Sequence, residues 1–170
     1  QKITSSIMDS KLSYGRMEKE DPFREGKLYL GTENALYVSY DEGEQWQSLM
    51  TNLPASPMYW MDIPEHFNDL VVGTYGRGIW ILDDLSPLQQ FTEEVAASDM
   101  HLFVPKDAYR FQPVTANMQF YPEPHSGTDP PFGASLHYWL SEETADTMED
   151  SISLVITSME GDTLRTMSQS

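Results

Sequence analysis

The chain has 170 residues, of which 27 are Asp or Glu and 10 are Lys or Arg, and it contains no cysteine. This length fits one domain, or one small domain and part of another, and 39% hydrophobic residues can form a core, which excludes a wholly disordered chain. The formal charge of −17 disfavours nucleic acid and anionic membrane surfaces as partners, and the lack of cysteine excludes a disulfide scaffold, a thiolate metal site and a cysteine nucleophile.

The chain starts with Gln1 rather than methionine, so we expect a piece of a longer precursor. The longest apolar runs are far shorter than the ~20 residues of a membrane helix, and no membrane insertion is expected.

Short apolar, aromatic and β-branched runs dominate the first half of the sequence. Each run is bounded by Gly, Pro, Asn or Asp, which is typical of strands joined by tight turns. The runs cover residues 27–32, 35–40, 58–63, 70–74 and 78–82. They predict an all-β structure up to about residue 85, and a helix is expected from Pro87 to Ser98. Six aromatic residues in predicted strands are expected to be core residues: Tyr29, Tyr37, Trp46, Trp60, Trp80 and Trp139.

Two of these runs repeat. LYLGT at 28–32 matches LVVGT at 70–74 with an offset of 42, and LYV at 36–38 matches IWI at 79–81 with an offset of 43. A period in the low forties that carries several strands is the length of a propeller blade. Two hairpins of an ordinary β-sandwich are the alternative explanation.

A hairpin signature follows the first repeat, in the segment SYDEGEQW at 39–46. It fits the pattern Ser-x-Asp-x-Gly-x-x-Trp, with Ser39 as its first residue. We expect Asp41 to accept backbone N–H bonds inside the turn, Gly43 to adopt a left-handed conformation, and Trp46 to anchor the returning strand in the core.

These residues resemble the Asp-box, or BNR repeat, of sialidases, sortilin-type receptor domains, xyloglucan hydrolases and many secreted bacterial propellers. Residues 69–84, DLVVGTYGRGIWILDD, resemble the final blade of the sortilin-like bacterial proteins often labelled "glycosyl hydrolase", and the resemblance covers roughly residues 17–111. It implies the last blades of an Asp-box β-propeller in a secreted, periplasmic or cell-surface protein. The second unit lacks a box, as suits a last blade.

At most two blades are present, whereas a propeller typically has about 4–8 blades. The resemblance therefore implies that the partners of this segment are the remaining blades of the parent protein or another protein chain.

The sequence changes character after residue 98. Residues 1–98 are interpreted as terminal propeller blades. Residues 99–132, which hold five prolines after residue 112, are interpreted as a Pro-rich linker that begins with one strand and its exit over His101–Phe111. Residues 133–170 are interpreted as the start of an immunoglobulin-like β-sandwich, as in the same bacterial family. We expect strands at 134–140, 152–157 and 163–167, and an acidic loop at 142–150. A complete sandwich has about seven strands, so this one is partial.

No catalytic constellation is visible in the sequence. Asp62, Asp83 and Asp84 are weak candidates for the paired carboxylates of a glycosidase, and turn or capping roles explain them better. The four histidines show no paired ligand spacing, the acidic loop lacks the pattern of a calcium loop, and we expect neither a metal nor another cofactor.

Arg77 is the best candidate for recognition. The turn Tyr75-Gly-Arg77-Gly joins the second and third strands of its blade, so it opens on the opposite side from Asp41. Tyr75, Arg77 and Tyr59 can then line a rim suited to a carboxylate or a sugar. Alternatively, Arg77 bonds backbone carbonyls of the neighbouring blade and secures ring closure.

The leading hypothesis is a non-catalytic segment of a secreted Asp-box propeller that binds protein, peptide or glycan. A part of a glycoside hydrolase, with most catalytic acids outside this segment, is one alternative. A structural subunit of a larger complex is the other.

Overall fold

A computed structural model describes residues 14–108, 133–147 and 152–169. The described chain forms two compact units. The first contains residues 14–91, 103–108 and 133–137, and the second contains residues 92–102, 138–147 and 152–169. Small antiparallel sheets dominate both units, which confirms the prediction of a β-rich fold.

The first unit begins with a four-stranded sheet. Its strands β1 (Gly15–Glu20), β2 (Leu28–Thr32), β3 (Leu36–Ser39) and β4 (Gln47–Ser48) lie side by side in chain order, each antiparallel to the next. The apolar runs predict β2 and β3. They miss β1, whose sequence GRMEKE is mostly polar, and β4, which is two residues long.

A three-stranded sheet follows, with β5 (Met58–Asp62), β6 (Leu70–Thr74) and β7 (Ile79–Leu82) again antiparallel and in chain order. All three strands coincide with predicted runs. Among the described residues, β7 pairs only with β6, so its other edge carries no strand.

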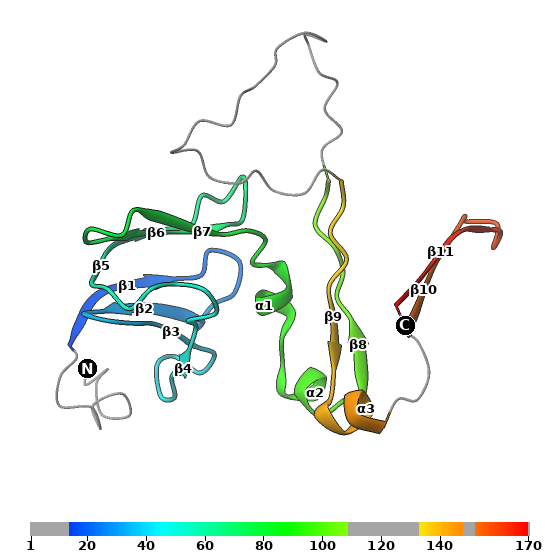
Figure 1. Cartoon of the computed structure of the whole chain (residues 1–170), viewed down its shortest axis with the longest axis horizontal. Coiled ribbons are helices and arrows are strands. Elements are labelled where there is room, and N and C mark those ends of the chain that lie inside the picture. Colours follow the sequence, from blue (N-terminus) through cyan, green and yellow to red (C-terminus); the bar gives the residue numbers. More distant parts are fainter. Residues whose placement is uncertain (1–13, 109–132, 148–151, 170) are drawn as a thin grey trace, which may run out of the picture. The chain divides into compact units, whose positions relative to one another are not determined.

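The two sheets pack face to face and appear as stacked layers in Figure 1. Buried apolar side chains fill the space between them: Tyr29, Leu36 and Val38 from one sheet, and Met58, Met61, Leu70 and Val72 from the other. The layers approach closely at Gly31, where an added Cβ would lie 2.7 Å from the Cβ of Met58. Leu85 completes this core from the segment after β7.

Trp60 is not a core residue, contrary to the expectation, because 51% of it is exposed. A β-bulge between Met58 and Trp60 is the cause. The bulge adds one residue to β5, so that Met58 and Met61 both point into the core and Trp60 points to the outer face.

The single helix expected at 87–98 is wrong. Two short helices replace it, α1 (Ser86–Gln90) in the first unit and α2 (Glu93–Ala96) in the second. Phe91 is extended, and Thr92 caps α2 by accepting a hydrogen bond from the Val95 N–H. The extended backbone at Phe91 ends α1 and prevents one continuous helix.

The second unit pairs β8 (Met100–Leu102) with β9 (Tyr138–Leu140). Both strands are shorter than predicted, since residues 134–137 are not in a strand and β8 ends at Leu102. Residues 109–111 of the first predicted strand lie outside the described residues.

The strands β10 (Ile152–Thr157) and β11 (Thr163–Gln169) coincide with the strands predicted at 152–157 and 163–167 and pair as an antiparallel hairpin. The acidic loop predicted at 142–150 is wrong over residues 142–147, which form α3 (Glu142–Thr147). Ser141 supplies the reason, because its Oγ accepts a hydrogen bond from the Thr144 N–H and starts the helix. Residues 148–150 lie outside the described residues.

Candidate functional site

The turn at 39–46 is a compact hydrogen-bonded hairpin with the geometry that its sequence predicts. Asp41 Oδ1 accepts the Gln45 N–H at 2.8 Å and the Ser39 hydroxyl at 2.8 Å. The buried Ser39 Oγ accepts the Gly43 N–H at 2.9 Å, and Gly43 has a φ of +88°. The hydrogen bond from Gln45 holds the pKa of Asp41 below its usual value.

Trp46 closes this turn and lies partly buried. Its Nε1–H donates to the Gly43 carbonyl at 3.0 Å, and an added Cβ at Gly43 would lie 3.3 Å from the indole. Ser39, Asp41, Gly43 and Trp46 therefore hold each other in place. Their interactions lie within the hairpin, which gives them a structural role.

An aromatic and cationic cluster, the rim cluster, lies at the other end of the sheets. Tyr59 and Tyr75 stand with ring centroids 5.5 Å apart, and the guanidinium of Arg16 lies 4.5 Å from the centre of the Tyr59 ring. Tyr14 lies on the other side of Arg16, at 5.3 Å. The three tyrosines are 55–69% exposed, so their rings are open to a ligand.

Two equivalent β-bulges build the rim cluster. The register shifts between Gly15 and Met17 in β1 and between Met58 and Trp60 in β5, so that Arg16 and Tyr59 are the extra residues. Bulges change the direction of a side chain relative to the regular strand. Here they bring together two residues that are 43 positions apart.

Glu33 neutralises the cation of the rim cluster. It accepts a hydrogen bond from Arg16 Nε, and Arg16 Nη2 also donates to the Tyr14 hydroxyl at 3.1 Å. Glu33 raises the pKa of both Tyr14 and Arg16, and hydrogen bonds from Tyr14 and then Arg16 lower the pKa of Glu33. The cluster is therefore a set of exposed rings around an internally paired charge.

Sequence reasoning named Tyr59 and Tyr75 for this rim but chose Arg77 as its cation. Arg77 lies in the turn before β7 and is exposed, and its carbonyl accepts the Trp80 Nε1–H at 2.9 Å. Within the described residues its guanidinium makes neither a hydrogen bond nor an ion pair. Arg16 was missed because it stands in a polar strand, and the 43-residue offset to Tyr59 is the signal that relates the two.

The three candidate acids have different surroundings and do not act together. Lys19 Nζ lies 2.8 Å from Asp62 Oδ1 and lowers the pKa of Asp62. Burial, and then the nearby Asp69, raises the pKa of Asp83. The raised pKa of Asp83 is in the direction that a general acid needs, whereas the lowered pKa of Asp62 is in the opposite direction.

Asp84 is buried and lies just before α1. Its Oδ1 accepts the Ser86 hydroxyl at 2.6 Å and the Ser86 N–H at 3.1 Å, and its φ is +59°. Its second oxygen lies 3.4 Å from His137 Nε2. Asp84 therefore has the turn role that the sequence favours, but it does not cap α1, whose N-cap is Leu85.

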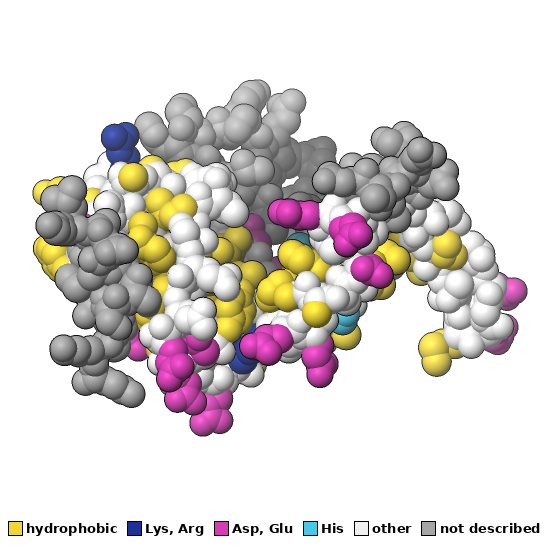
Figure 2. All heavy atoms as spheres, turned by 90° about the horizontal axis from the view of Figure 1, so that it is seen from below, with side chains coloured by type: hydrophobic (Ala, Val, Ile, Leu, Met, Phe, Trp, Pro, Cys, Tyr) yellow, Lys and Arg dark blue, Asp and Glu magenta, His cyan; other side chains and the backbone are white. Residues whose placement is uncertain are grey.

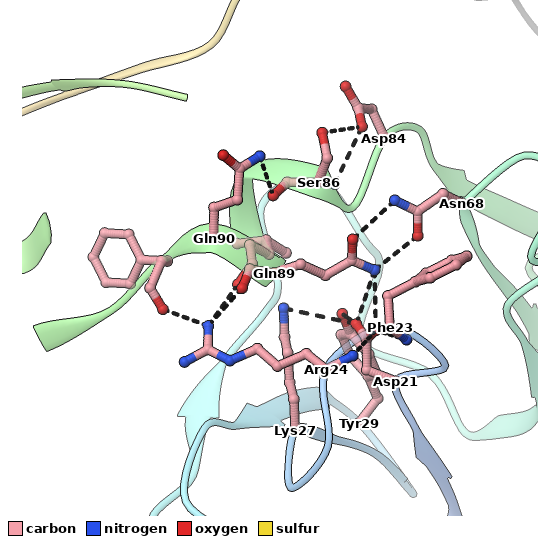
Figure 3. Close-up of polar contacts among 12 residues, drawn as sticks. Asp21, Phe23, Arg24, Lys27, Tyr29, Asn68, Asp84, Ser86, Gln89 and Gln90 are labelled. Atoms are coloured by element: carbon pink, nitrogen blue, oxygen red, sulfur yellow. Dashed lines mark hydrogen bonds and ion pairs between the residues drawn. The ribbon is translucent and has the colours of Figure 1, made fainter. Parts of the chain in front are cut away.

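A buried polar cluster, the Asp21 cluster, ties the segment of α1 to the four-stranded sheet (Figure 3). Asp21 accepts the Tyr29 hydroxyl at 3.0 Å and Gln89 Nε2 at 3.0 Å. Gln89 also exchanges two hydrogen bonds with the side-chain amide of Asn68. Arg24 Nη1 completes the attachment by donating to the Gln89 carbonyl at 2.9 Å.

Lys27 is the charged member of the Asp21 cluster with the fewest contacts. Its side chain is fully buried, and its Nζ lies 3.9 Å from Asp21 Oδ2 without a hydrogen bond. The rings of Tyr40 and Tyr29 lie 5.0 and 5.3 Å from this nitrogen. Burial lowers the pKa of Lys27 to about 7, against the opposing effect of Asp21. Because the amine is buried among the described residues, we interpret the cluster as a structural element.

Two further surfaces belong to the three-stranded sheet. Its outer face exposes Trp60, Ile79 and Ile81 to 51%, 74% and 58%. An apolar pocket lies beside β7, lined by Leu36, Leu49, Leu53, Leu70, Val72 and Trp80, among others.

Acidic side chains predominate over basic ones on the face shown in Figure 2, in keeping with the composition. No group of three or more His, Asp or Glu in the described part of the chain is placed to hold a metal ion. None of the described helices is long and apolar enough to cross a membrane.

Comparisons of this chain with protein-family models, with curated proteins and with solved structures yield no match.

Proposed function

We propose that this chain is a non-catalytic binding segment of a secreted Asp-box β-propeller and that its rim cluster recognises a glycan. The observation that carries the proposal is the exposed Tyr59–Tyr75 pair with Arg16 beside it. Exposed aromatic rings offer flat apolar faces next to polar groups, the combination that carbohydrate and peptide ligands use.

The pairing of Arg16 with Glu33 favours a neutral sugar over an anionic ligand. A carboxylate would have to displace Glu33 from the guanidinium, whereas a sugar ring can stack on Tyr59 or Tyr75 and leave this ion pair intact. Arg77 stands in the same turn as Tyr75 and adds a positive charge at the edge of the rim.

The propeller part of the proposal is supported by the repeated strands, the box hairpin and the stacking of the two sheets. The outer face of the three-stranded sheet is the counterpart of the face that the four-stranded sheet buries: Ile79 and Ile81 correspond to Leu36 and Val38. A further sheet of the same kind, from the remaining blades of the parent or from another protein chain, is the partner that fits it.

A glycan array tests the recognition role, with the whole chain and the variant Tyr75→Ala. Because Tyr75 is 69% exposed, its replacement should leave the melting temperature unchanged and weaken glycan binding at least tenfold. Phe67→Ala is the matched control, since Phe67 is 58% exposed and stands outside the rim cluster. Unchanged binding by Tyr75→Ala would refute the role of the rim.

Arg77→Ala separates the two roles of that residue. A loss of glycan binding at constant melting temperature supports a role in recognition. Constant binding with a lower melting temperature supports a role in ring closure.

A part of a glycoside hydrolase is the second candidate, favoured by the raised pKa of Asp83, which burial and Asp69 cause. Hydrolysis of chromogenic glycosides that is lost in Asp83→Asn and kept in Asp62→Asn would establish it.

The immunoglobulin-like sandwich proposed for 133–170 rests on the hairpin of β10 and β11 and on the pairing of β8 with β9.

A further inference from the structure

The two sheets of the first unit differ by one strand. In the four-stranded sheet, β4 lies along β3, and the Leu49 N–H donates to the Leu36 carbonyl at 2.9 Å. Ile79 of β7 corresponds to Leu36 by the 43-residue offset. No described strand takes the place of β4 beside β7.

The free edge of β7 has defined hydrogen-bonding groups. The Thr74 N–H donates to the Gly78 carbonyl, so Gly78 faces β6. Backbone groups in an antiparallel strand point to alternate sides. Trp80 and Leu82 therefore also face β6, whereas the N–H and C=O groups of Ile79 and Ile81 point to the free edge.

The apolar pocket adjoins this edge. Leu49 and Leu53, which both follow the fourth strand of the neighbouring sheet, line it together with Trp80 of β7. Within residues 14–108, 133–147 and 152–169, the three-stranded sheet has no fourth strand to cover these side chains. A strand added along β7 would direct every second side chain to the side where the pocket lies.

Charges differ at the two ends of the edge. Arg77 precedes β7, and Asp83 and Asp84 follow it. A strand antiparallel to β7 would have its N-terminal end beside Asp83 and its C-terminal end beside Arg77. A basic residue at the first end and an acidic residue at the second would complement these charges.

We infer that the free edge of β7 binds an extended segment of another polypeptide, which adds as an antiparallel fourth strand. The segment carries apolar side chains at alternate positions, a basic residue at its N-terminal end and an acidic one at its C-terminal end. Main-chain hydrogen bonds to Ile79 and Ile81 hold it, and the pocket beside Trp80 selects its side chains. This surface shares Arg77 with the edge of the proposed glycan rim, but the main-chain pairing along β7 does not depend on glycan binding.

A labelled seven-residue peptide tests the inference on the whole chain. The probe has Lys first, Glu last, and Thr alternating with Val between them. We expect saturable binding by fluorescence anisotropy, with a loss of at least tenfold when the probe is N-methylated at alternate residues along its pairing edge. Exchanging Lys and Glu in the probe should weaken binding severalfold. Equal binding of the N-methylated probe would overturn the inference.

Amide hydrogen exchange by NMR gives a residue-specific readout with internal controls. In the free chain, the amides of Ile79 and Ile81 should exchange fast, and those of Trp80 and Leu82 slowly. The peptide should slow Ile79 and Ile81 at least tenfold. Slow exchange of these two amides in the free chain would show that the edge is not free. Protection that grows with protein concentration would show that a second copy of the chain is the occupant. Either result would overturn the inference.

A pair of variants separates the backbone donor from the side chain. Ile81→Pro removes the N–H at the free edge, a position where proline is tolerated, and should abolish peptide binding. Ile81→Thr keeps the N–H and should bind within about twofold of the original chain. Equal loss in both variants would contradict strand addition.

Discussion

The four-stranded and three-stranded sheets carry the same strand pattern, but their corresponding faces have opposite surroundings. Leu36 and Val38 are each 3% exposed, whereas their counterparts Ile79 and Ile81 are 74% and 58% exposed. The repeat therefore encodes a face that is suited to burial, and burial itself depends on whether another sheet lies opposite. Of these two corresponding faces, only the one that carries Leu36 and Val38 has another sheet opposite it among the described residues.

The glycine in each repeat shows the same difference. A Cβ at Gly31 would lie 2.7 Å from the Cβ of Met58 in the facing sheet. A Cβ at Gly73 would meet only Trp60 of its own sheet, at 3.5 Å. The sequence keeps glycine at both positions, as expected if both faces are meant to approach another sheet closely.

Leu36→Ala and Ile79→Ala should give the largest contrast. Leu36→Ala removes a buried side chain between the sheets and should lower the free energy of unfolding by about 2–5 kcal/mol. Ile79→Ala should change it by less than about 0.5 kcal/mol, because the side chain is exposed. Urea unfolding followed by tryptophan fluorescence measures both. Similar losses would mean that the outer face is already covered.

Gly31→Ala and Gly73→Ala form the next pair. Gly31→Ala forces the sheets apart or shifts Met58, and overpacking of this kind costs about 1–3 kcal/mol. Gly73→Ala meets an ordinary contact distance and should cost less than about 0.5 kcal/mol. The same unfolding experiment applies. A larger loss for Gly73→Ala than for Gly31→Ala would contradict the stacking of the sheets.

The sequence predicts the strands of both sheets well where the apolar residues are continuous. The runs predicted at 27–32, 35–40, 58–63, 70–74 and 78–82 contain the strands β2, β3, β5, β6 and β7, because each contributes to one core. It fails at β1, where Met17 is the one apolar side chain in a polar strand. Pairing with β2, rather than the propensity of its residues, makes this segment a strand.

The bulges explain why the sequence pattern misplaces Trp60 and does not indicate Arg16. An inserted residue breaks the alternation of inward and outward side chains, so the regular pattern puts Trp60 in the core and gives no sign of Arg16 at the rim. The sequence favours Arg77 because it stands in a turn that the sequence pattern identifies directly. Arg16 and Tyr59 come from different sheets, so their contact is tertiary. The 43-residue spacing between the two bulged residues is the signal that relates them.

Lys27→Met should change how stability depends on pH. Lys27 has a folded-state pKa of about 7 against an ordinary value of 10.5, so the unfolded chain binds the proton more tightly. Between these values the free energy of unfolding should rise with pH, by at most about 1.4 kcal/mol per pH unit. Asp21, Arg24, Tyr29 and Tyr40 surround the amine and remain in the variant.

The Lys27→Met chain should lose this rise and be more stable near pH 7, since no ammonium group has to be buried. Lys19→Met is the control, because the Lys19 side chain is 38% exposed and pairs with Asp62 at the surface. Urea unfolding between pH 6.5 and 10 measures the slope. A slope that persists in Lys27→Met would assign the dependence to another group. The three-stranded sheet has no lysine at the corresponding position. Asp69 takes the place of Lys27 before β6, and its Oδ1 accepts the Asp84 N–H at 2.8 Å.

Ser39→Ala tests the box hairpin, which only the four-stranded sheet has. The substitution removes the acceptor of the Gly43 N–H and the donor to Asp41, and should destabilise the chain by about 1 kcal/mol. Ser48→Ala, at an exposed position of β4, should have no measurable effect. If the hairpin mainly holds β4 against β3, Ser39→Ala should also speed amide exchange of Leu49 while exchange in β6 stays constant. Uniform acceleration in both sheets would instead show that the turn stabilises the whole core. The stability of the three-stranded sheet would then depend on the four-stranded sheet, although no strand of one pairs with a strand of the other among the described residues.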